Sequence, residues 1–220
     1  MAAECYVSLK RIEGVLSLDD LDAILGKNNL SSYGETVSAQ NLKAKFYGSN
    51  EYFFLDLEFS INAGELVGIV GPVGSGKSSF LSLFTGGMEL SGDLVFPDTV
   101  AVCPQEPWII ADTVRENILL GRDLDKNWYL KVVTSCCLLE DFDSFSKGDL
   151  TVVGERGVTL SGGQRARINL ARAVYKTADL YLLDLGWKII YQLIDLVYRL
   201  GYLFMKILFY DCLKPTYAAR

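Results

Sequence analysis

The 220-residue sequence contains no histidine, and this absence limits the chemistry available to the chain. Histidine is the usual general base near neutral pH and the commonest side-chain ligand of transition metals. The sequence therefore excludes a mechanism with a histidine base, and any histidine-ligated metal, within these residues.

Cysteine occurs five times, but not in spacings typical of metal or redox sites. No C-x-x-C pair is present, and the neighbouring Cys136 and Cys137 are poorly placed to bridge to each other. This pattern favours reduced thiols in the cytosol, with core packing as their ordinary role. The chain opens without a cationic segment followed by an apolar block, so we expect no secretory signal.

Positive charge does not accumulate anywhere in the sequence. The net charge is −6, and no basic run marks a surface patch, so we predict no nucleic-acid partner. Half of the residues are hydrophobic, which is enough for a sizeable core. The length fits one domain, or one domain with extensions.

One stretch carries most of the functional information. Residues 71–78 read GPVGSGKS and fit the P-loop pattern G-x-x-x-x-G-K-S. In this pattern backbone N–H groups turn toward phosphate oxygens, the lysine reaches the β- and γ-phosphates, and the serine hydroxyl ligates Mg²⁺. The predicted nucleotide-binding residues of this stretch are Gly71, Val73, Gly74, Ser75, Gly76, Lys77, Ser78 and Ser79.

The flanks supply the context that the P-loop pattern needs. Residues 66–70 are apolar and predict a buried strand, and residues 79–84 predict the start of a helix that stops at Gly86 and Gly87. A glycine-rich turn that matches by chance is the alternative. The order of strand, loop and helix argues against it.

Further elements are expected on both sides of the P-loop. Residues 4–25 predict an amphipathic helix, and residues 26–38 a polar linker. Two strands are expected within residues 40–61, and a strand over 93–103 is interrupted at Pro97 and Asp98.

A helical segment follows. Thr113 and Glu116 fit a capping box that opens a short helix, and Asp125 is placed to cap a second helix over residues 126–142. Residues 148–160 are rich in turn residues and predict a connection.

Two glycines stand in the first turn of the next predicted helix. Residues 160–164 read LSGGQ, and Ser161 is a good N-cap. Each glycine costs a helix about 1 kcal/mol relative to alanine. Close approach of a phosphate to bare N–H groups explains Gly162 and Gly163, whereas a plain capped surface helix does not.

A strand over residues 179–184 ends in a carboxylate, Asp184. A strand that ends in aspartate is commonly structural. After a P-loop and the LSGGQ segment, however, we expect Asp184 to lie beside Ser78 and to hold Mg²⁺ directly or through water.

Together these residues resemble the nucleotide-binding domain of ATP-binding cassette (ABC) transporters over about residues 4–184. The resemblance identifies residues 71–78 as Walker A, Gln105 as the Gln-loop, residues 160–164 as the signature and residues 180–184 as Walker B. Finer details resemble the first such domain of subfamily C, the multidrug-resistance-associated exporters. These details are GPVGSGKSS, PQEPWI, RENI and ARAVY.

The resemblance implies ATP and Mg²⁺ as cofactors. It gives Lys77 and Gln105 catalytic roles, and Gln105 joins Ser78 and Asp184 as a metal-side residue. Tyr47 lies where an aromatic ring stacks on adenine in the family, with Phe46 as the alternative.

The resemblance also implies two partners. Ser161, Gly162, Gly163 and Gln164 would face a nucleotide held by a second domain in a head-to-tail sandwich. The region of residues 108–118 and the helices after it would dock against the transmembrane domains of an exporter. We therefore expect a membrane-associated domain on the cytoplasmic face, or a cytoplasmic protein if the chain is expressed alone.

The family pattern stops after Asp184. Where the family continues with an acidic residue, this chain has Leu185, and the later Pro-x-Ser-x-x-Asp run and switch histidine are absent. Hydrolysis is therefore expected to be impaired, which leaves three alternatives: a transporter ATPase domain, a module that binds ATP without efficient hydrolysis, and a truncated product that folds poorly.

The expected fold class is α/β. We predict a P-loop NTPase core of the ABC type with an antiparallel β part, a helical subdomain, and a sheet that is incomplete at the C-terminus. The predicted organisation is an amphipathic segment and linker at 1–38, a truncated nucleotide-binding domain at 39–184, and a hydrophobic tail outside the family pattern at 185–220. The tail could form an interfacial helix, a helix that covers the sheet, or a stretch that is not evolved coding sequence.

Overall fold

The computed structural model describes residues 2–16, 30–31, 36–154, 158–184 and 205–211. In chain order its elements are α1 (Ala2–Leu16), β1 (Leu30–Ser31), β2 (Val37–Phe46), β3 (Phe54–Ile61), β4 (Leu66–Gly71), α3 (Lys77–Phe84), β5 (Met88–Val95), β6 (Val100–Cys103), α4 (Val114–Leu119), α5 (Lys126–Ser135), α6 (Leu139–Ser144), the 3₁₀ turn η1 (Gly148–Leu150), α7 (Gly162–Tyr175), β7 (Leu180–Asp184) and β8 (Met205–Asp211). Strands lie on both sides of helix α3 in the P-loop region, a helical segment extends from α4 to α7, and two further strands follow.

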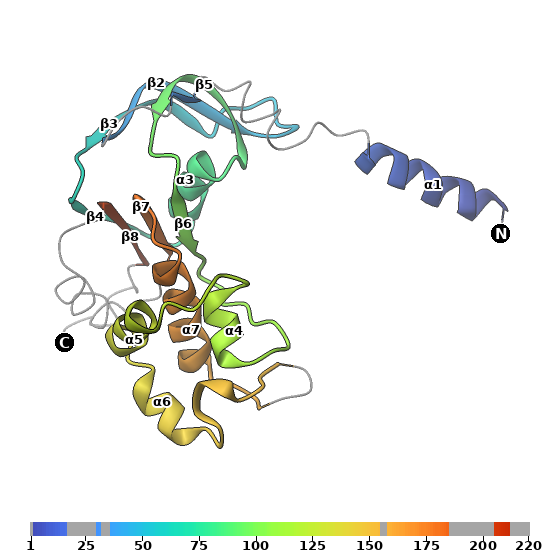
Figure 1. Ribbon diagram of the computed structural model, residues 1–220. Helices are drawn as coiled ribbons and strands as arrows, with labels where there is room; N and C mark the ends of the chain where they lie inside the picture. The colour runs from blue at the N-terminus through green and yellow to red at the C-terminus, as the bar shows by residue number, and fades with distance from the viewer. Residues whose placement is uncertain (1, 17–29, 32–35, 155–157, 185–204, 212–220) are drawn as a thin grey trace, which may run out of the picture.

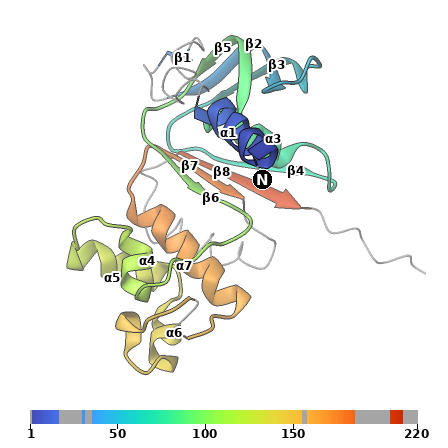
Figure 2. The ribbon, with the colours of Figure 1, turned by 90° about the vertical axis from the view of Figure 1, so that its right-hand side faces the viewer.

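Two four-stranded sheets lie above a lobe of helices (Figures 1 and 2). The upper sheet has the order β1-β5-β2-β3, and its β2 pairs antiparallel with both β3 and β5. The second sheet has the order β4-β8-β7-β6, and all of its strands are parallel. The expected α/β class, with an antiparallel part and a helical part, is confirmed.

Strand β7 lies between the two hydrophobic cores and belongs to both. Successive side chains of a strand point to opposite faces of the sheet. Leu180 and Leu182 pack with the core formed by α3 and the antiparallel sheet, whereas Tyr181 and Leu183 pack with the core of α4, α5 and α7. Both faces of β7 are therefore buried, which explains why its sequence is a continuous apolar run. Asp184 is the last residue of the strand and lies at the end nearest the P-loop.

The prediction that residues 66–70 form a buried strand is correct for the strand and wrong for its burial. Val67 and Ile69 are partly buried against the upper core, but Leu66 and Val70 are 45% and 62% exposed. The exposure alternates along β4, so the side chains on one face of the strand are less covered than those on the other.

The helix predicted over residues 126–142 forms as two helices. Asp125 caps α5 as expected, with its carboxylate accepting from the N–H groups of Asn127 and Trp128. The chain then turns at Cys137, whose φ of +55° lies in the left-handed region, and α6 begins at Leu139. The left-handed residue ends the helical run, because consecutive helix residues need negative φ.

The two ends of the chain are only partly described. The expected helix over residues 4–25 is present as α1 up to Leu16, and the rest of that prediction lies outside the described residues. In the tail, Lys206 belongs to strand β8 rather than to the predicted helix, and the register pairs Gly71 with Asp211. The remaining tail predictions lie outside the described residues.

Helices of membrane-spanning length and apolarity do not occur in the described ranges of the chain.

Candidate functional site

The P-loop is a tight turn between the end of β4 and the start of α3. Gly74 and Gly76 have φ values of +83° and +87°, a conformation that side chains disfavour. Gly76 is the N-cap of α3 and provides no side-chain hydrogen bond to it. The first N–H groups of α3, which carry the positive end of the helix dipole, are therefore not capped by a side chain.

Lys77 lies at the first position of α3, and its ammonium group folds back over the loop. Its Nζ donates to the backbone oxygens of Gly71 at 3.0 Å and Pro72 at 2.9 Å. The loop thus holds a charged donor beside the uncapped helix start, which is the arrangement that binds a phosphate.

Ser78 and Asp184 meet at the carboxyl edge of the parallel sheet, although 106 positions separate them in the chain. The Ser78 hydroxyl donates to Asp184 Oδ2 at 2.8 Å. This contact confirms the predicted proximity of the two residues. A hydroxyl and a carboxylate on neighbouring elements are hard oxygen ligands of the kind that Mg²⁺ prefers.

The donor set around Ser78 fits Mg²⁺ better than a transition metal. Groups of three or more carboxylate, thiol or imidazole ligands are absent from the part of the chain that the structure describes. Protein sites for Mg²⁺ commonly use only one or two carboxylates, together with water and substrate phosphates. Asp184 and Ser78 next to a phosphate-binding loop match that composition.

Gln105 lies on the exposed segment that follows β6. Both flanks of this segment are tied to α7: Asn169 Nδ2 donates to the oxygen of Pro104 at 3.2 Å, and Arg172 Nη2 donates to the oxygen of Trp108 at 3.0 Å. The sequence singles out Gln105, whereas Asn169 lies outside the quoted motifs and Arg172 is noted only as part of ARAVY.

The LSGGQ segment forms a complete capping box at the start of α7. The backbone N–H of Gln164 donates to Ser161 Oγ at 3.2 Å, and the Ser161 N–H donates to Gln164 Oε1 at 2.9 Å. A Cβ added at Gly162 would meet nothing within 4 Å, and one at Gly163 would meet only the Arg167 guanidinium, at 3.4 Å. Packing inside the chain therefore does not require these two glycines.

An aromatic side chain lies against the P-loop, and it is Phe53. A Cβ added at Gly76 would be 2.8 Å from Cε1 of Phe53. The Phe53 ring also makes edge contacts with Phe46 and Phe54, at centroid distances of 5.4 and 4.9 Å. Tyr47, the residue singled out by the sequence, is 42% exposed in the same hairpin.

Comparison with known proteins decides which family this arrangement belongs to. The family model described as "ABC transporter" matches residues 54–185, which include the P-loop, Gln105, the LSGGQ segment and Asp184. The chain belongs to the ABC transporter family.

Members of subfamily C are among its relatives. Human ATP-binding cassette sub-family C member 4 is 44% identical over 185 residues, which cover 83% of this chain and 14% of the relative. ATP-binding cassette transporter abc2 of Schizosaccharomyces pombe is 42% identical over 82% of this chain and 13% of the relative. Human sub-family C member 2 is 39% identical over 82% of this chain and 12% of the relative. The chain thus spans about one seventh of the length of these relatives.

The ABC signature and the P-loop lie in different parts of the molecule. Helix α7 has 14 residues, so about 21 Å separate its first turn from the end that leads to β7. Figure 1 shows the start of α7 in the helical lobe and the P-loop between β4 and α3 in the upper part. The start of α7 and the P-loop therefore lie apart in this view.

Proposed function

We propose that this ABC domain binds Mg-ATP at its P-loop and that, within a longer subfamily C transporter, it couples ATP hydrolysis to export across a membrane. The hydrogen bond from Ser78 to Asp184 beside the P-loop is the observation that carries the proposal. The contact brings a hydroxyl and a carboxylate oxygen together beside Lys77 and the uncapped start of α3, which supports binding of Mg²⁺ and phosphate there.

Each residue of the site has a defined part in nucleotide binding. Lys77 exchanges its contacts with the loop carbonyls for β- and γ-phosphate oxygens. Ser78 and Asp184 would hold Mg²⁺, and the ion would supply charge neutralisation to the phosphates. Gln105, on the segment after β6, would help to hold the metal and to orient the attacking water.

We further propose that the signature acts on a nucleotide held by a second domain. The start of α7 lies in the helical lobe and the P-loop lies beside the parallel sheet (Figure 1), which supports a nucleotide that comes from outside the chain. The open space around Gly162 leaves its backbone accessible to a phosphate from outside. A head-to-tail sandwich of two domains satisfies both observations.

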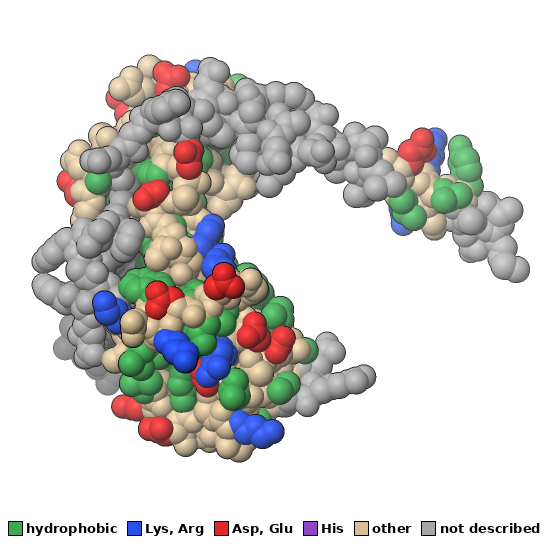
Figure 3. All heavy atoms as spheres, viewed as in Figure 1, with side chains coloured by type: hydrophobic (Ala, Val, Ile, Leu, Met, Phe, Trp, Pro, Cys, Tyr) green, Lys and Arg blue, Asp and Glu red, His purple; other side chains and the backbone are tan. Residues whose placement is uncertain are grey.

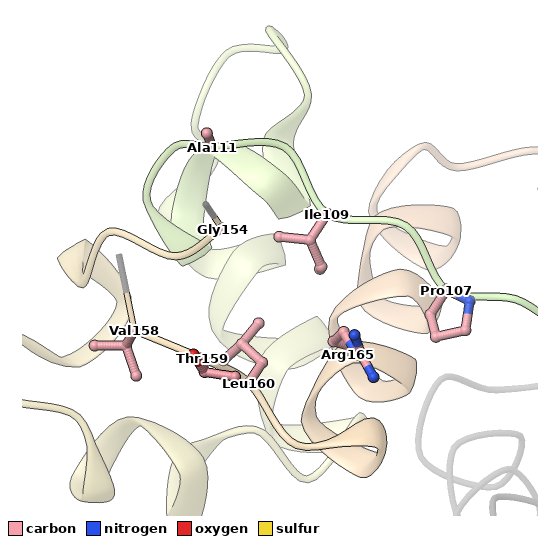
Figure 4. Close-up of a pocket in the computed structure, with 8 residues that line it drawn as sticks. All are labelled: Pro107, Ile109, Ala111, Gly154, Val158, Thr159, Leu160 and Arg165. Atoms are coloured by element: carbon pink, nitrogen blue, oxygen red, sulfur yellow. The ribbon is translucent and has the colours of Figure 1, made fainter. Parts of the chain in front are cut away.

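The helical lobe offers the surface that we propose for docking to transmembrane domains. A cavity of about 390 Å³ lies there between the segment that precedes α4 and the segment that precedes α7 (Figure 4). Figure 3 shows hydrophobic patches on this lobe between charged side chains. The residues that line the cavity include Pro107, Ile109, Ala111, Val158, Leu160 and Arg165. Such docking would hold the domain at the cytoplasmic face of a membrane.

Mg²⁺ is expected to strengthen ATP binding through Asp184. We predict that Asp184→Asn removes most of the difference between the ATP affinity with Mg²⁺ and that with EDTA, a loss of about tenfold, because a charged metal ligand is replaced by a neutral one. Titration calorimetry under both conditions measures the difference. The exposed Asp143 on α6 provides the control, and Asp143→Asn should leave the difference unchanged. Equal losses in the two variants would contradict the assignment of Asp184.

The two aromatic candidates for base contact make different predictions. We expect Phe53→Ala to weaken ATP binding by fivefold or more, because stacking on an aromatic ring contributes about 1–3 kcal/mol per base. Tyr47→Ala should change the affinity by less than about twofold on the same scale. Inorganic triphosphate should bind both variants equally well. If Tyr47→Ala instead produced the larger loss for ATP, the base contact would belong to Tyr47, as the family resemblance implies.

A second candidate function is ATP binding without efficient turnover. The observation that favours it is Leu185, which directly follows Asp184 where the family carries an acidic residue. A carboxylate at that position polarises the attacking water, and leucine cannot do so. In this case the domain would regulate a transporter by opening and closing on ATP, while a facing domain supplies the hydrolytic site.

A further inference from the structure

A buried polar cluster links the signature helix to the segment that carries Gln105. Its members are Asn169 and Arg172, one turn apart on α7, and Asn117 on α4. These three side chains are 3%, 6% and 0% exposed. Burial of a charge and two amides costs free energy unless every polar group is hydrogen-bonded. The hydrogen bonds within the cluster therefore fix how its three side chains are oriented.

Asn169 holds the beginning of the Gln105 segment. Its Nδ2 donates to the oxygen of Pro104 and to the Sγ of Cys103, both at 3.2 Å. Its Oδ1 accepts from Arg172 Nη1 at 3.1 Å, so the amide orientation is set by the arginine. The residue directly before Gln105 is thus fixed to α7.

Arg172 holds the other end of the segment. Its guanidinium lies 3.6 Å from the centre of the Trp108 ring and also donates to the Trp108 oxygen. It donates further to the backbone and side-chain oxygens of Asn117, at 2.7 and 3.2 Å. All of these acceptors are neutral groups, and burial lowers the pKa of Arg172 to about 10, so the side chain stays charged at neutral pH.

We propose that Asn169 and Arg172 are positioning residues that fasten both ends of the Gln105 segment to the signature helix. They make the position of Gln105 depend on that of α7, whose first turn carries the signature. Movement of α7 when the signature engages a partner is thereby passed to the Gln105 side chain. This inference rests on the proposed function, because Gln105 acts through the bound Mg-ATP.

The test compares ATP affinity with Mg²⁺ and with EDTA in the 220-residue chain. We expect Gln105→Ala, Asn169→Ala and Arg172→Lys each to reduce the advantage given by Mg²⁺ by about tenfold, with affinity in EDTA within twofold of the unmodified chain. Lysine keeps the charge of Arg172 but lacks the planar fork that bonds Trp108 and Asn117 together. Combining Asn169→Ala with Gln105→Ala should cause no further loss, because both changes remove the same contact.

Arg167→Lys is the matched control on the same helix. Arg167 donates to both carboxylate oxygens of Asp141, at 2.7 and 2.8 Å, rather than to Pro104 or Trp108. This variant should melt at a lower temperature and keep the full Mg²⁺ advantage. An unchanged advantage in the two cluster variants, or an equal loss in Arg167→Lys, would overturn the proposal.

Fluorescence of Trp108 gives a second readout. In a chain with Trp128→Phe and Trp187→Phe, we expect Mg-ATP to change the Trp108 emission and Gln105→Ala to abolish that change. Unaltered emission on binding would overturn the coupling while leaving ATP binding intact. If the unmodified chain bound no ATP at all, that result would contradict the proposed function, and with it the coupling that depends on bound ATP.

Discussion

Replacement of Lys77 by alanine is expected to weaken ATP binding by about 10- to 150-fold. The ammonium group is the charged donor closest to the phosphate site, and a hydrogen bond to a charged group contributes about 1.5–3 kcal/mol. In the structure the ammonium group donates to the carbonyl of Gly71 in a partly buried bond and to that of Pro72 in an exposed one, so we expect water to replace it at these acceptors. Titration calorimetry with Mg-ATP measures the loss.

The melting temperature of this variant without nucleotide should stay within about 2 °C of the unmodified chain, because partly exposed polar contacts contribute little to stability. The exposed Lys131 on α5 provides a charge-matched control, and Lys131→Ala should bind ATP normally. Equal affinities of the Lys77→Ala variant and the unmodified chain would contradict the assignment of the phosphate site to the P-loop.

The second large effect concerns hydrolysis. We expect the unmodified chain to hydrolyse ATP slowly and Leu185→Glu to raise the turnover rate by about 10²-fold or more, since general-base catalysis contributes about 10²- to 10⁴-fold. Leu185→Gln has nearly the same shape as glutamate but cannot accept a proton, and should therefore remain slow. Phosphate release should be measured over a range of chain concentrations, because the proposed sandwich requires two domains.

Two outcomes would count against this account of hydrolysis. Fast turnover by the unmodified chain that Lys77→Ala abolishes would show that position 185 needs no carboxylate. Slow turnover by both Leu185→Glu and Leu185→Gln would show that the missing carboxylate is not what limits the rate.

The P-loop and the start of α7 could be predicted from the sequence because their signals are local. A P-loop needs a strand, a glycine turn and a helix in immediate succession, and residues 66–84 contain all three. The cap of α7 is equally local, since Ser161 and Gln164 are three positions apart. Asp184 required a longer inference, from an apolar strand to its place at the sheet edge, and the contact with Ser78 confirms it.

The aromatic contact with the P-loop could not be predicted in the same way. The contact depends on the register in which β2 pairs with its neighbouring strands. That pairing contains register shifts around Asn41 and Leu42. Asn41 has a φ of +48°, and this irregularity shifts the residues that follow it relative to the neighbouring strands. For this reason Phe53 lies against Gly76, although Tyr47 has the more suggestive place in the sequence.

Other differences arise from tertiary context. Leu66 and Val70 are exposed because they lie on the less covered face of β4, and the composition of the strand does not show which face is covered. The break between α5 and α6 at Cys137 could not be predicted, because no glycine or proline in the sequence marks it. The cluster of Asn117, Asn169 and Arg172 joins residues up to 55 positions apart, and it becomes visible only when α4 and α7 are packed together.

Thermal unfolding of the unmodified chain, with and without Mg-ATP, tests the central claim most directly. A ligand at one hundred times its dissociation constant stabilises the folded state by about 2.7 kcal/mol. For a chain of this size we predict a rise in melting temperature of about 5–10 °C. The rise should be smaller with ATP and EDTA and absent with Mg²⁺ alone. An unchanged melting temperature at saturating Mg-ATP would contradict the conclusion that this domain binds ATP.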